Sequence, residues 1–451
     1  MTTFVRGTAA RCVIAGLLLW STRAGGQSSG ARVSFAGWSL PRPELDAGAM
    51  GVGIVTHAAP AIFGESRTEG YLTQPSLLGQ LRIGTFAMTG TLNLEGYTLR
   101  RGELNAGIYG EGYVDRRHPH TLVHEAMFSW ATPERRRWQL SIAAGKGFTP
   151  YGTDDPMMRP MVKFPVNHHH AQIIERVQTI AAVRLGPRGR AVTLEHAVFN
   201  GDEPIGPFTG PVWSRYGDSH ATRLTFMPTT WLEAQASRAF VRSPGITQGG
   251  AFDHTQRSAS VRVDRSGSSA HAAHEMSGGG SHMAASRADR RYVLLEVAQT
   301  SEGFGSREVF QYQSLLAEAM ATHRGWGVAL RAERTDRPES ERLLDPFRVA
   351  NGHIDFQIIG ITRWSVGTVQ LSAPPSSLPI LRRAHLAPFV EIGAARGTSL
   401  RTPSVFVPRE FYGANTLWSV TAGVRVHVGE MRARMGRYGV LDVRPLPTPP
   451  Q

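Results

Sequence analysis

The chain has 451 residues, a formal net charge of +13 at pH 7 and a single cysteine, Cys12. One cysteine excludes a disulfide framework and a cysteine-based metal or redox centre. No stretch beyond the N-terminal region approaches the ~18 uninterrupted apolar residues of a membrane-spanning helix, so helical membrane spans are also excluded. The basic charge favours anionic partners, and no motif typical of nucleic-acid binding accompanies it.

Residues 1–26 have the three parts of a secretory signal peptide. Arg6 and Arg11 form a basic start, the apolar run CVIAGLLLW follows, and small residues surround Ala24. The apolar run is far shorter than the ~20 residues that a membrane-spanning helix needs. We expect this leader to be removed on export. The mature chain then has no thiol and a formal charge of 13 − 3 = +10, because Arg6, Arg11 and Arg23 are lost.

Residues 27–78 carry turn signals, such as PRPELDAGAMG and IFGESRTEG, but little periodic pattern. Clusters of Gly, Pro and acidic residues without alternation are typical of irregular segments. We interpret this stretch as an N-terminal extension that lies in the periplasm or folds into a lumen.

From Leu81 onward the chain repeats one pattern, in which segments of roughly eight to twelve residues alternate apolar and polar side chains between breaks rich in Gly, Pro and Arg. In TLWSVTAGVRVHVG, Trp418 and Val420 share one parity, and Ser419 and Arg425 share the other. Successive side chains of a strand point to opposite faces, so each segment has an apolar and a polar face. The expected strands are a hairpin that starts at Leu81 and breaks near Thr89-Gly90, followed by segments 122–130, 138–145, 173–185, 192–201, 220–228, 231–241, 257–264, 291–300, 309–323, 326–334, 354–366, 385–397, 416–429 and 431–439.

This pattern predicts an all-β fold, an antiparallel transmembrane β-barrel of the outer-membrane type with roughly 14–16 strands. The barrel would occupy residues 79–443, and a Pro-rich tail would follow at residues 444–451. Segment 309–323 also fits an amphipathic helix. Long connections alternate with short ones, as in outer-membrane barrels, which have short periplasmic turns and long outer loops. The alternative is a soluble β-sandwich, which strands this long and numerous disfavour.

Histidines that could bind a metal ion gather in three places. The string VDRRHPHTLVHE places His118, His120 and His124 on one parity of an extended backbone, and HAAHEMSGGGSHM combines histidine with methionine in a Gly/Ser-rich segment. Imidazole suits copper, nickel and zinc, and imidazole with a thioether favours copper. The alternative interpretation is that these histidines bind no metal and form hydrogen bonds to carbonyl groups in polar turns. The candidate metal ligands are His118, His120, His124, His168, His169 and His170.

Arginines lie inside several of the expected strands. An arginine that faces lipid costs ~2–4 kcal/mol at the bilayer midplane, so we expect them to line the lumen. Acidic residues such as Glu195, Glu333 and Glu391 lie in strands as well. Either a water-filled pore with a transverse field or a lumen closed by ion pairs would follow. The candidate lumen-lining residues are Arg223, Arg262, Arg331, Arg363, Arg425 and Arg434.

Enzyme motifs are incomplete, and we expect the protein not to be an enzyme. The pair His124-Glu125 lacks the second histidine of a zinc-protease helix, and the chain has no GxSxG or CxxC string. A hydrolase sited in the outer loops, with Asp154-Asp155 or Asp202-Glu203 as its acids, is a minor alternative. Such acidic pairs are more often solvated turns.

At DRRHPH, residues 115–120, the chain resembles an uncharacterised family of bacterial outer-membrane β-barrel proteins with an Asp-Arg-(Gln or Arg)-His-Pro-His motif. The strings VFNGDEP (198–204) and DSHATRLTFMP (218–228), together with the histidine run, resemble further strings of that family. Thr121 and Asp202 depart from its pattern, which usually has Asp and Arg there. Genes of the family are often found near heavy-metal resistance determinants. The resemblance therefore implies a Gram-negative outer-membrane barrel and a link to metal resistance.

We accordingly expect a porin-like channel of the bacterial outer membrane, reached by signal-peptide-directed export, whose Arg-rich polar lumen passes small anionic solutes passively. No cofactor is required. The alternative is a metal-associated outer-membrane protein that binds copper-like or zinc ions through its histidine clusters. Expected partners are outer-membrane lipid, the phosphate groups of lipopolysaccharide, and small solutes or metal ions.

Overall fold

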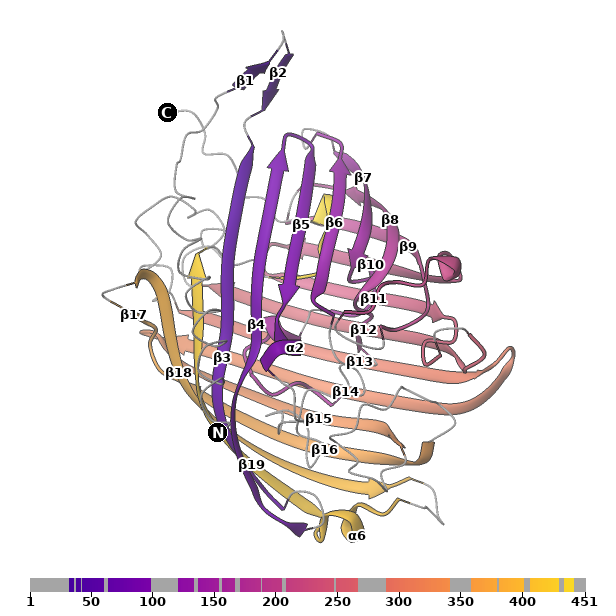
Figure 1. Ribbon diagram of the computed structural model, residues 1–451, viewed down its shortest axis with the longest axis vertical. Helices are drawn as coiled ribbons and strands as arrows, with labels where there is room; N and C mark the ends of the chain where they lie inside the picture. The colour runs from indigo at the N-terminus through magenta and orange to yellow at the C-terminus, as the bar shows by residue number, and fades with distance from the viewer. Residues whose placement is uncertain are drawn as a thin grey trace, which may run out of the picture.

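The computed structural model describes residues 32–35, 38–41, 43–60, 64–98, 121–133, 137–153, 156–166, 171–187, 189–204, 208–246, 249–266, 289–340, 358–378, 381–400, 406–429 and 434–441. Within them, sixteen long strands close into one antiparallel barrel (Figure 1). In none of these residues is there a helix of the length and apolar character needed to cross a membrane.

The barrel strands follow the chain order, each pairing with its neighbour in sequence. They are β3 (Glu44–Ala59), β4 (Arg67–Ile83), β5 (Phe86–Asn93), β6 (Val123–Ala131), β7 (Trp138–Gly147), β8 (Arg176–Leu185), β9 (Ala191–Phe199), β10 (Ser219–Thr229), β11 (Leu232–Val241), β12 (Asp253–Ser266), β13 (Arg290–Phe304), β14 (Arg307–His323), β15 (Trp326–Ser340), β16 (Ile358–Ser372), β18 (Leu381–Ser399) and β19 (Thr416–Gly429). The barrel closes where β19 pairs with β3, with Trp418 opposite Ala59 and Gly429 opposite Gly48.

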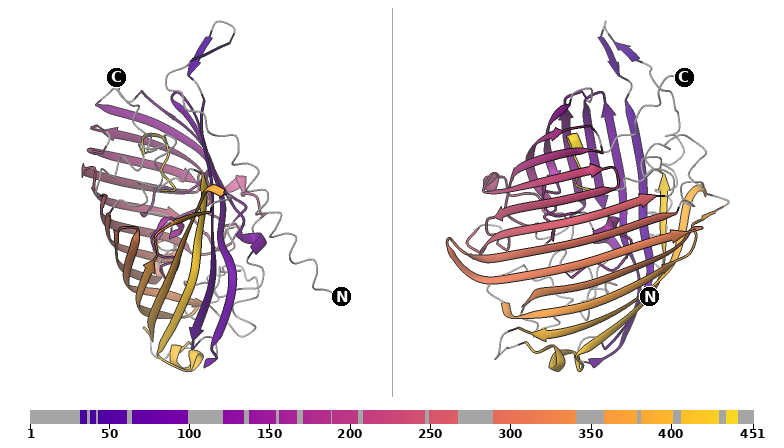
Figure 2. Two further views of the ribbon diagram at one scale, coloured as in Figure 1. Left: turned by 90° about the vertical axis from the view of Figure 1, so that its left-hand side faces the viewer. Right: turned by 180° about the vertical axis from the view of Figure 1, so that it is seen from behind.

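Smaller elements decorate the barrel. The short strand β17 (Ser376–Leu378) pairs with β18 between β16 and β18. The remaining elements are the hairpin of β1 (Arg32–Phe35) and β2 (Trp38–Pro41), the helices α2 (Glu95–Thr98) and α6 (Pro408–Tyr412), and the 3₁₀ turns η2 (Pro156–Met158), η3 (Trp213–Arg215) and η5 (Gly439–Leu441). The β1–β2 hairpin projects beyond one end of the barrel (Figure 2).

The two ends of the barrel differ in their connections. At the end where β3 begins and β19 finishes, which we call the terminal end, two-residue turns join β4 to β5 and β14 to β15. Gly84 and Gly325 adopt positive φ in these turns, at 60° and 86°, a backbone region that glycine enters without a steric penalty. At the opposite end, the loop end, long connections follow β7, β9 and β18.

The barrel is apolar outside and polar inside. Along β13, Leu295 and Val297 face outward and are about half exposed, whereas Glu296 between them is fully buried. Outward-facing aromatic side chains lie near both ends of the strands, as in the girdles of membrane barrels. Near the terminal end they are Phe86, Trp130, Trp138, Phe226 and Trp326, and near the loop end they include Phe304 and Trp418. The prediction of an antiparallel transmembrane β-barrel of the outer-membrane type is therefore confirmed, at the upper limit of the expected strand count.

The predicted N-terminal extension, residues 27–78, is wrong. Most of it forms β3 and the first part of β4, which complete the barrel wall. Gly51, Gly53 and Pro75 interrupt the alternation of apolar and polar residues, and the register shifts between Met50 and Val52. A glycine in a strand often marks a bulge, so a pattern that looked like turns belongs to two irregular strands.

Two further boundaries also differ. The first hairpin breaks at Gly84-Thr85 rather than near Thr89-Gly90, and the described part of segment 431–439, from Arg434 on, forms no barrel strand. The last strand ends at Gly429, and residues 434–441 lie inside the barrel. Segment 309–323 falls within β14, so the strand interpretation holds over the helical one. The signal peptide and the tail lie outside the described residues.

We predict that Leu295→Arg lowers the free energy of unfolding in lipid by about 2–4 kcal/mol, because an arginine would then face the hydrocarbon. The matched control is Ser301→Arg, three outward positions nearer the loop end on the same strand and opposite the uncharged Thr255 and Gln311, with an expected cost of about 0–1 kcal/mol. Denaturant unfolding of each variant in lipid vesicles measures both values. Equal costs would contradict the position assigned to the apolar belt.

Candidate functional site

The candidate site is the lumen and the connection between β7 and β8, residues 148–175, which we call the inner loop. Its described residues are almost all buried, including Met161, Val162 and Phe164. Val162 packs against Val52, Ile54 and Phe389 of the barrel wall. An outer loop exposed to water would not bury such residues, so the inner loop folds into the barrel and narrows it.

Carboxylates of the wall accept hydrogen bonds from the backbone of the inner loop. Glu391 of β18 accepts from the N–H groups of Val162 and Lys163, both at 3.1 Å. Glu333 of β15 accepts from the N–H of Val166 at 2.8 Å. A hydrogen bond to a charged group is worth about 1.5–3 kcal/mol, and a buried N–H without a partner costs about as much. These two carboxylates therefore fix the loop against one side of the lumen.

Arginines of the wall bind the carbonyl groups of the same segment. Arg331 of β15 donates to the carbonyl oxygen of Lys163 at 2.6 Å and pairs with Glu318 at 2.7 Å. Arg425 of β19 donates to the carbonyl oxygens of Arg159, at 3.4 Å, and Pro160. In the described part of the chain Arg425 forms no ion pair with a carboxylate. Backbone carbonyls are its hydrogen-bond acceptors there, whereas the carboxylates of Glu391 and Glu318 act on its charge without a direct bond.

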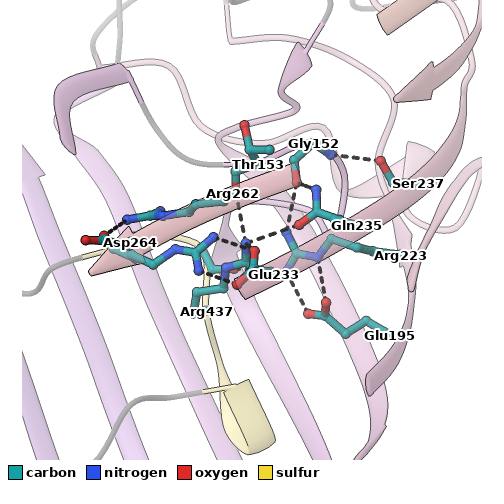
Figure 3. A network of polar contacts seen from close by, with 12 residues as sticks. Gly152, Thr153, Glu195, Arg223, Glu233, Gln235, Ser237, Arg262, Asp264 and Arg437 are labelled. Carbon is teal, nitrogen blue, oxygen red and sulfur yellow. Dashed lines mark hydrogen bonds and ion pairs between the residues drawn. The ribbon is translucent and has the colours of Figure 1, made fainter. Parts of the chain in front are cut away.

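The start of the inner loop is held at Gly152 on the opposite wall (Figure 3). Its N–H donates to the hydroxyl of Ser237 at 3.0 Å, and its carbonyl accepts from Arg223, at 3.4 Å, and Gln235. Arg223 also forms a two-point ion pair with Glu195, with N–O distances of 2.6 and 2.8 Å. Gly152 has φ of +67°, and a Cβ there would collide with the carbonyl oxygen of Ala171. Only glycine fits this position without moving the loop.

Residues 434–441, which we call the C-terminal segment, lie against the inner loop inside the barrel. Arg434 binds Glu233 of β11 through two nitrogens, at 2.7 and 3.0 Å. The hydroxyl of Tyr438 donates to Glu125 at 2.7 Å and accepts from the N–H of Phe148 at 3.2 Å. The segment therefore links the wall near β6 and β11 to the start of the inner loop.

Lys163 is a titratable cation within the lumen. Its ammonium group donates to the hydroxyl of Ser419 at 3.0 Å, and its side chain is enclosed by the wall. Burial lowers the pKa of Lys163 from 10.5 to about 7, while Glu391 and Glu333 oppose that shift and Arg331 adds to it. The charge of Lys163 therefore changes near neutral pH.

The arginines predicted to line the lumen have different positions. Arg223, Arg331 and Arg425 project inward and contact the inner loop, as described above. Arg262, on the inward parity of β12, pairs with Asp264 at 2.9 Å and lies 5.1 Å from the ring of Tyr292. Arg434 lies in the C-terminal segment rather than in a strand.

The prediction that Arg363 lines the lumen is wrong, because this side chain faces outward. Its neighbour Trp364 points into the barrel and packs with Val166 of the inner loop, and the register of β16 runs without a shift through both residues. Arg363 pairs with Asp336 of β15, also on the outward parity, at 2.6 and 3.0 Å. Because it lies toward the loop end of β16, beyond the apolar belt, the cost of facing lipid is small there.

Of the candidate metal ligands, only His124 is among the described residues. It is fully buried, its Nδ1 lies 2.7 Å from a carboxylate oxygen of Glu175, and its ring packs edge-on against Phe148. Glu175 also accepts from the N–H of Thr121, so this pair joins the end of the inner loop to β6. No group of three or more metal-ligating side chains occurs among the described residues. His118, His120, His168, His169 and His170 lie outside them, and metal binding there stays a prediction.

The acids of the minor hydrolase alternative have structural partners where they are described. The side chain of Asn200 donates to Asp202, and Glu203 pairs with Arg176 at 2.9 Å. Asp154 and Asp155 lie outside the described residues. Two strings of the family resemblance, VFNGDEP and DSHATRLTFMP, thus contribute to hydrogen bonds among β8 and the residues next to β9 and β10 near the loop end, whereas DRRHPH and the histidine run lie outside the described residues.

Sequence reasoning missed the inner loop itself, with Gly152, Arg159 and Lys163. Arg159 pairs with Glu296 of β13 at 3.0 Å, and the hydroxyl of Thr153 bonds the same carboxylate. One signal was available, because the long connection after β7 carries the string PMMRPMVKF. An outer loop rarely needs so many large apolar residues, and such a string indicates burial.

No protein-family model matches the chain, and no curated protein matches it. Solved structures with a similar fold include an anion-selective porin from Comamonas acidovorans, at a TM-score of 0.47 and 10% identity over 86% of this chain and 100% of that one. A loop-deletion mutant of OmpT, an outer-membrane protein of Vibrio cholerae, has a TM-score of 0.45 and 8% identity over 85% and 99%. OpdK of Pseudomonas aeruginosa, solved with vanillate, has a TM-score of 0.38 and 9% identity over 86% and 99%. At these identities the likeness concerns the fold alone.

We predict that Gly152→Ala detaches the start of the inner loop while the barrel still folds. The added methyl collides with the carbonyl of Ala171, so residues 148–153 lose their bonds to Ser237 and Arg223. Hydrogen exchange should then show faster exchange across residues 148–166, with unchanged protection in β13 and β14.

The matched control is Gly210→Ala, because a Cβ at this exposed glycine meets nothing within 4 Å. Its exchange profile should equal that of the unchanged protein. Full protection of residues 148–166 in Gly152→Ala would contradict the anchoring role of Gly152.

Proposed function

We propose that the protein is a porin-like channel of the bacterial outer membrane, which passes small anionic solutes passively through a lumen that the inner loop narrows. The observation that carries this proposal is a charged segment held across the inside of a barrel whose outer face is apolar. Side chains of β10, β11, β13, β15, β18 and β19 all bind the inner loop. Any solute that crosses the barrel must pass this segment.

The cations near the inner loop support a preference for anions. Arg425 has carbonyl groups rather than a carboxylate as its bonded acceptors, and Lys163 adds a second cation close by. Guanidinium groups stay charged at every relevant pH and bind carboxylates and phosphates well. The chain without its expected leader is basic, with a formal charge of 13 − 3 = +10, which raises the local concentration of anions.

The first test is the conductance of the refolded chain in a planar bilayer across a KCl gradient. We expect stable current steps with a reversal potential that favours chloride over potassium. Folding is checked on the same sample by the mobility difference between heated and unheated protein on a gel. If folded protein gives no current, or if the reversal potential favours potassium, the proposal is contradicted.

The charge of Lys163 predicts a pH dependence of this selectivity. Because its pKa is lowered to about 7, the side chain is positive below that pH and neutral above it. The preference for chloride should therefore increase as the pH falls from 8 to 6. Glu391, Glu333 and Arg331 face the same ammonium group, and Ser419 accepts its hydrogen bond.

Two variants isolate Lys163 from other groups that titrate in this range, such as histidines. Lys163→Met should lower the chloride preference to the pH 8 level of the unchanged protein and reduce its pH dependence. Lys163→Arg keeps the charge, so it should hold the pH 6 level at both values. If both variants retain the pH dependence of the unchanged protein, another group is responsible.

A further inference from the structure

The barrel wall opens into a fork between β14 and β15 near the loop end. These two strands pair from His323 and Trp326 as far as Ser314 and Thr335. Beyond that point β14 continues to Arg307 alongside β13, and β15 continues to Ser340 alongside β16. In Figure 1 the tips of β13 and β14 turn away from the ends of β15 and β16. Among the described residues, the facing edges of the fork do not pair with each other.

A hollow of about 640 Å³ lies on the outward face at the base of this fork. Small side chains form its floor, Ser258, Ala298 and Ser314. Three arginines from three strands line it: Arg257 of β12, Arg334 of β15 and Arg363 of β16. Gln299, Gln313 and Asp336 complete its polar lining. Val297 and Leu315 line the side toward the apolar belt, so the hollow is polar above and apolar below.

The hollow carries an excess of positive charge. Its three arginines and one aspartate leave 3 − 1 = +2. Asp336 is already neutralised by its two-point pair with Arg363. Within the described part of the chain, Arg257 and Arg334 form no ion pair, and both are exposed. Arg238 lies directly beside Arg257 in the register of β11 and β12 and adds a fourth cation at its edge.

The chemistry of this hollow matches a phosphate group attached to a lipid. Guanidinium groups bind phosphate through paired hydrogen bonds, and glutamine amides add further donors. A free phosphate ion would use only these polar donors. A phosphate on a lipid would also place its acyl chains on Val297 and Leu315 and on the belt below them, which gives the apolar side of the hollow a role.

The position of the hollow along the barrel axis determines which leaflet of the membrane it faces. The two-residue turns lie at the terminal end of the barrel, whereas the hollow lies toward the loop end. In outer-membrane barrels the long loops face the cell exterior. The lipid of that leaflet is lipopolysaccharide, whose lipid part carries phosphate groups.

We infer that the fork between β14 and β15 is a binding site for a phosphate group of lipopolysaccharide, held by Arg257 and Arg334 next to the pair of Arg363 and Asp336. This inference rests on the outer-membrane location and is independent of conduction through the lumen. The bound lipid would lie over the fork, where β14 and β15 no longer pair with each other.

Native mass spectrometry of the refolded full-length barrel, in detergent without divalent cations, tests the site with bisphosphorylated lipid A as the probe. The double variant Arg257→Gln/Arg334→Gln should bind this lipid at least roughly tenfold more weakly, because two charge-assisted contacts are lost. The matched control, Arg291→Gln/Arg324→Gln, removes the same charge from exposed positions near the terminal end and should bind like the unchanged protein.

Two further binding experiments identify the source of the phosphate group. Lipid A without phosphate should bind as weakly to the unchanged protein as the bisphosphorylated lipid binds to the double variant. Inorganic phosphate in the millimolar range should leave the bound lipid in place. Equal losses in both double variants, no loss in either, or ready displacement by inorganic phosphate would overturn the inference.

Conductance of the Arg257→Gln/Arg334→Gln protein separates this site from the channel. It should equal that of the unchanged protein, since both side chains face outward. A barrel that binds the lipid but conducts no current would remove the proposed channel alone, whereas a conducting barrel without the lipid preference would remove the phosphate site alone.

Discussion

The hydrogen-bonding requirement of a peptide segment inside the barrel is the constraint on which the rest of the structure depends. An irregular segment that leaves water must find a partner for each N–H and carbonyl group. Here the wall supplies them, because Glu391 and Glu333 accept from N–H groups while Arg331 and Arg425 donate to carbonyls. Charged side chains on the inward parity are thus structural requirements of the inner loop as much as features of a pore.

The same requirement explains why most wall charges occur in pairs. Arg223 with Glu195 and Arg331 with Glu318 are buried ion pairs on adjacent strands. Each arginine in such a pair also binds a carbonyl of the inner loop, so neither charge is left uncompensated in the interior. Removing one partner of a buried pair is costly, because the other charge remains without compensation. Arg425 differs from these pairs, because its bonded acceptors are carbonyl groups of the inner loop rather than a carboxylate.

The alternation of apolar and polar residues was enough to predict the barrel, its antiparallel pairing and most of its strands. It failed at β3 and β4, where Gly51, Gly53 and Pro75 break the period that identifies a strand. The alternation of apolar and polar residues could not predict the inner loop, for a different reason. The contacts of Val166 with Glu333 and of Gly152 with Ser237 join residues far apart in the chain. Their pairing is decided by the curvature and closure of the barrel rather than by local sequence.

The outward position of Arg363 follows from the unequal lengths of the strands. β5 has 8 residues, whereas β18 has 19. An apolar belt of one height crosses all of a short strand but only part of a long one. The long strands therefore extend past the belt at the loop end, where outward side chains such as Gln313 and Arg334 are polar. Within the apolar belt, a polar residue of a long strand therefore indicates a side chain that faces the lumen. Beyond the belt, the same residue type also occurs on the outward face, at the polar surface of the membrane.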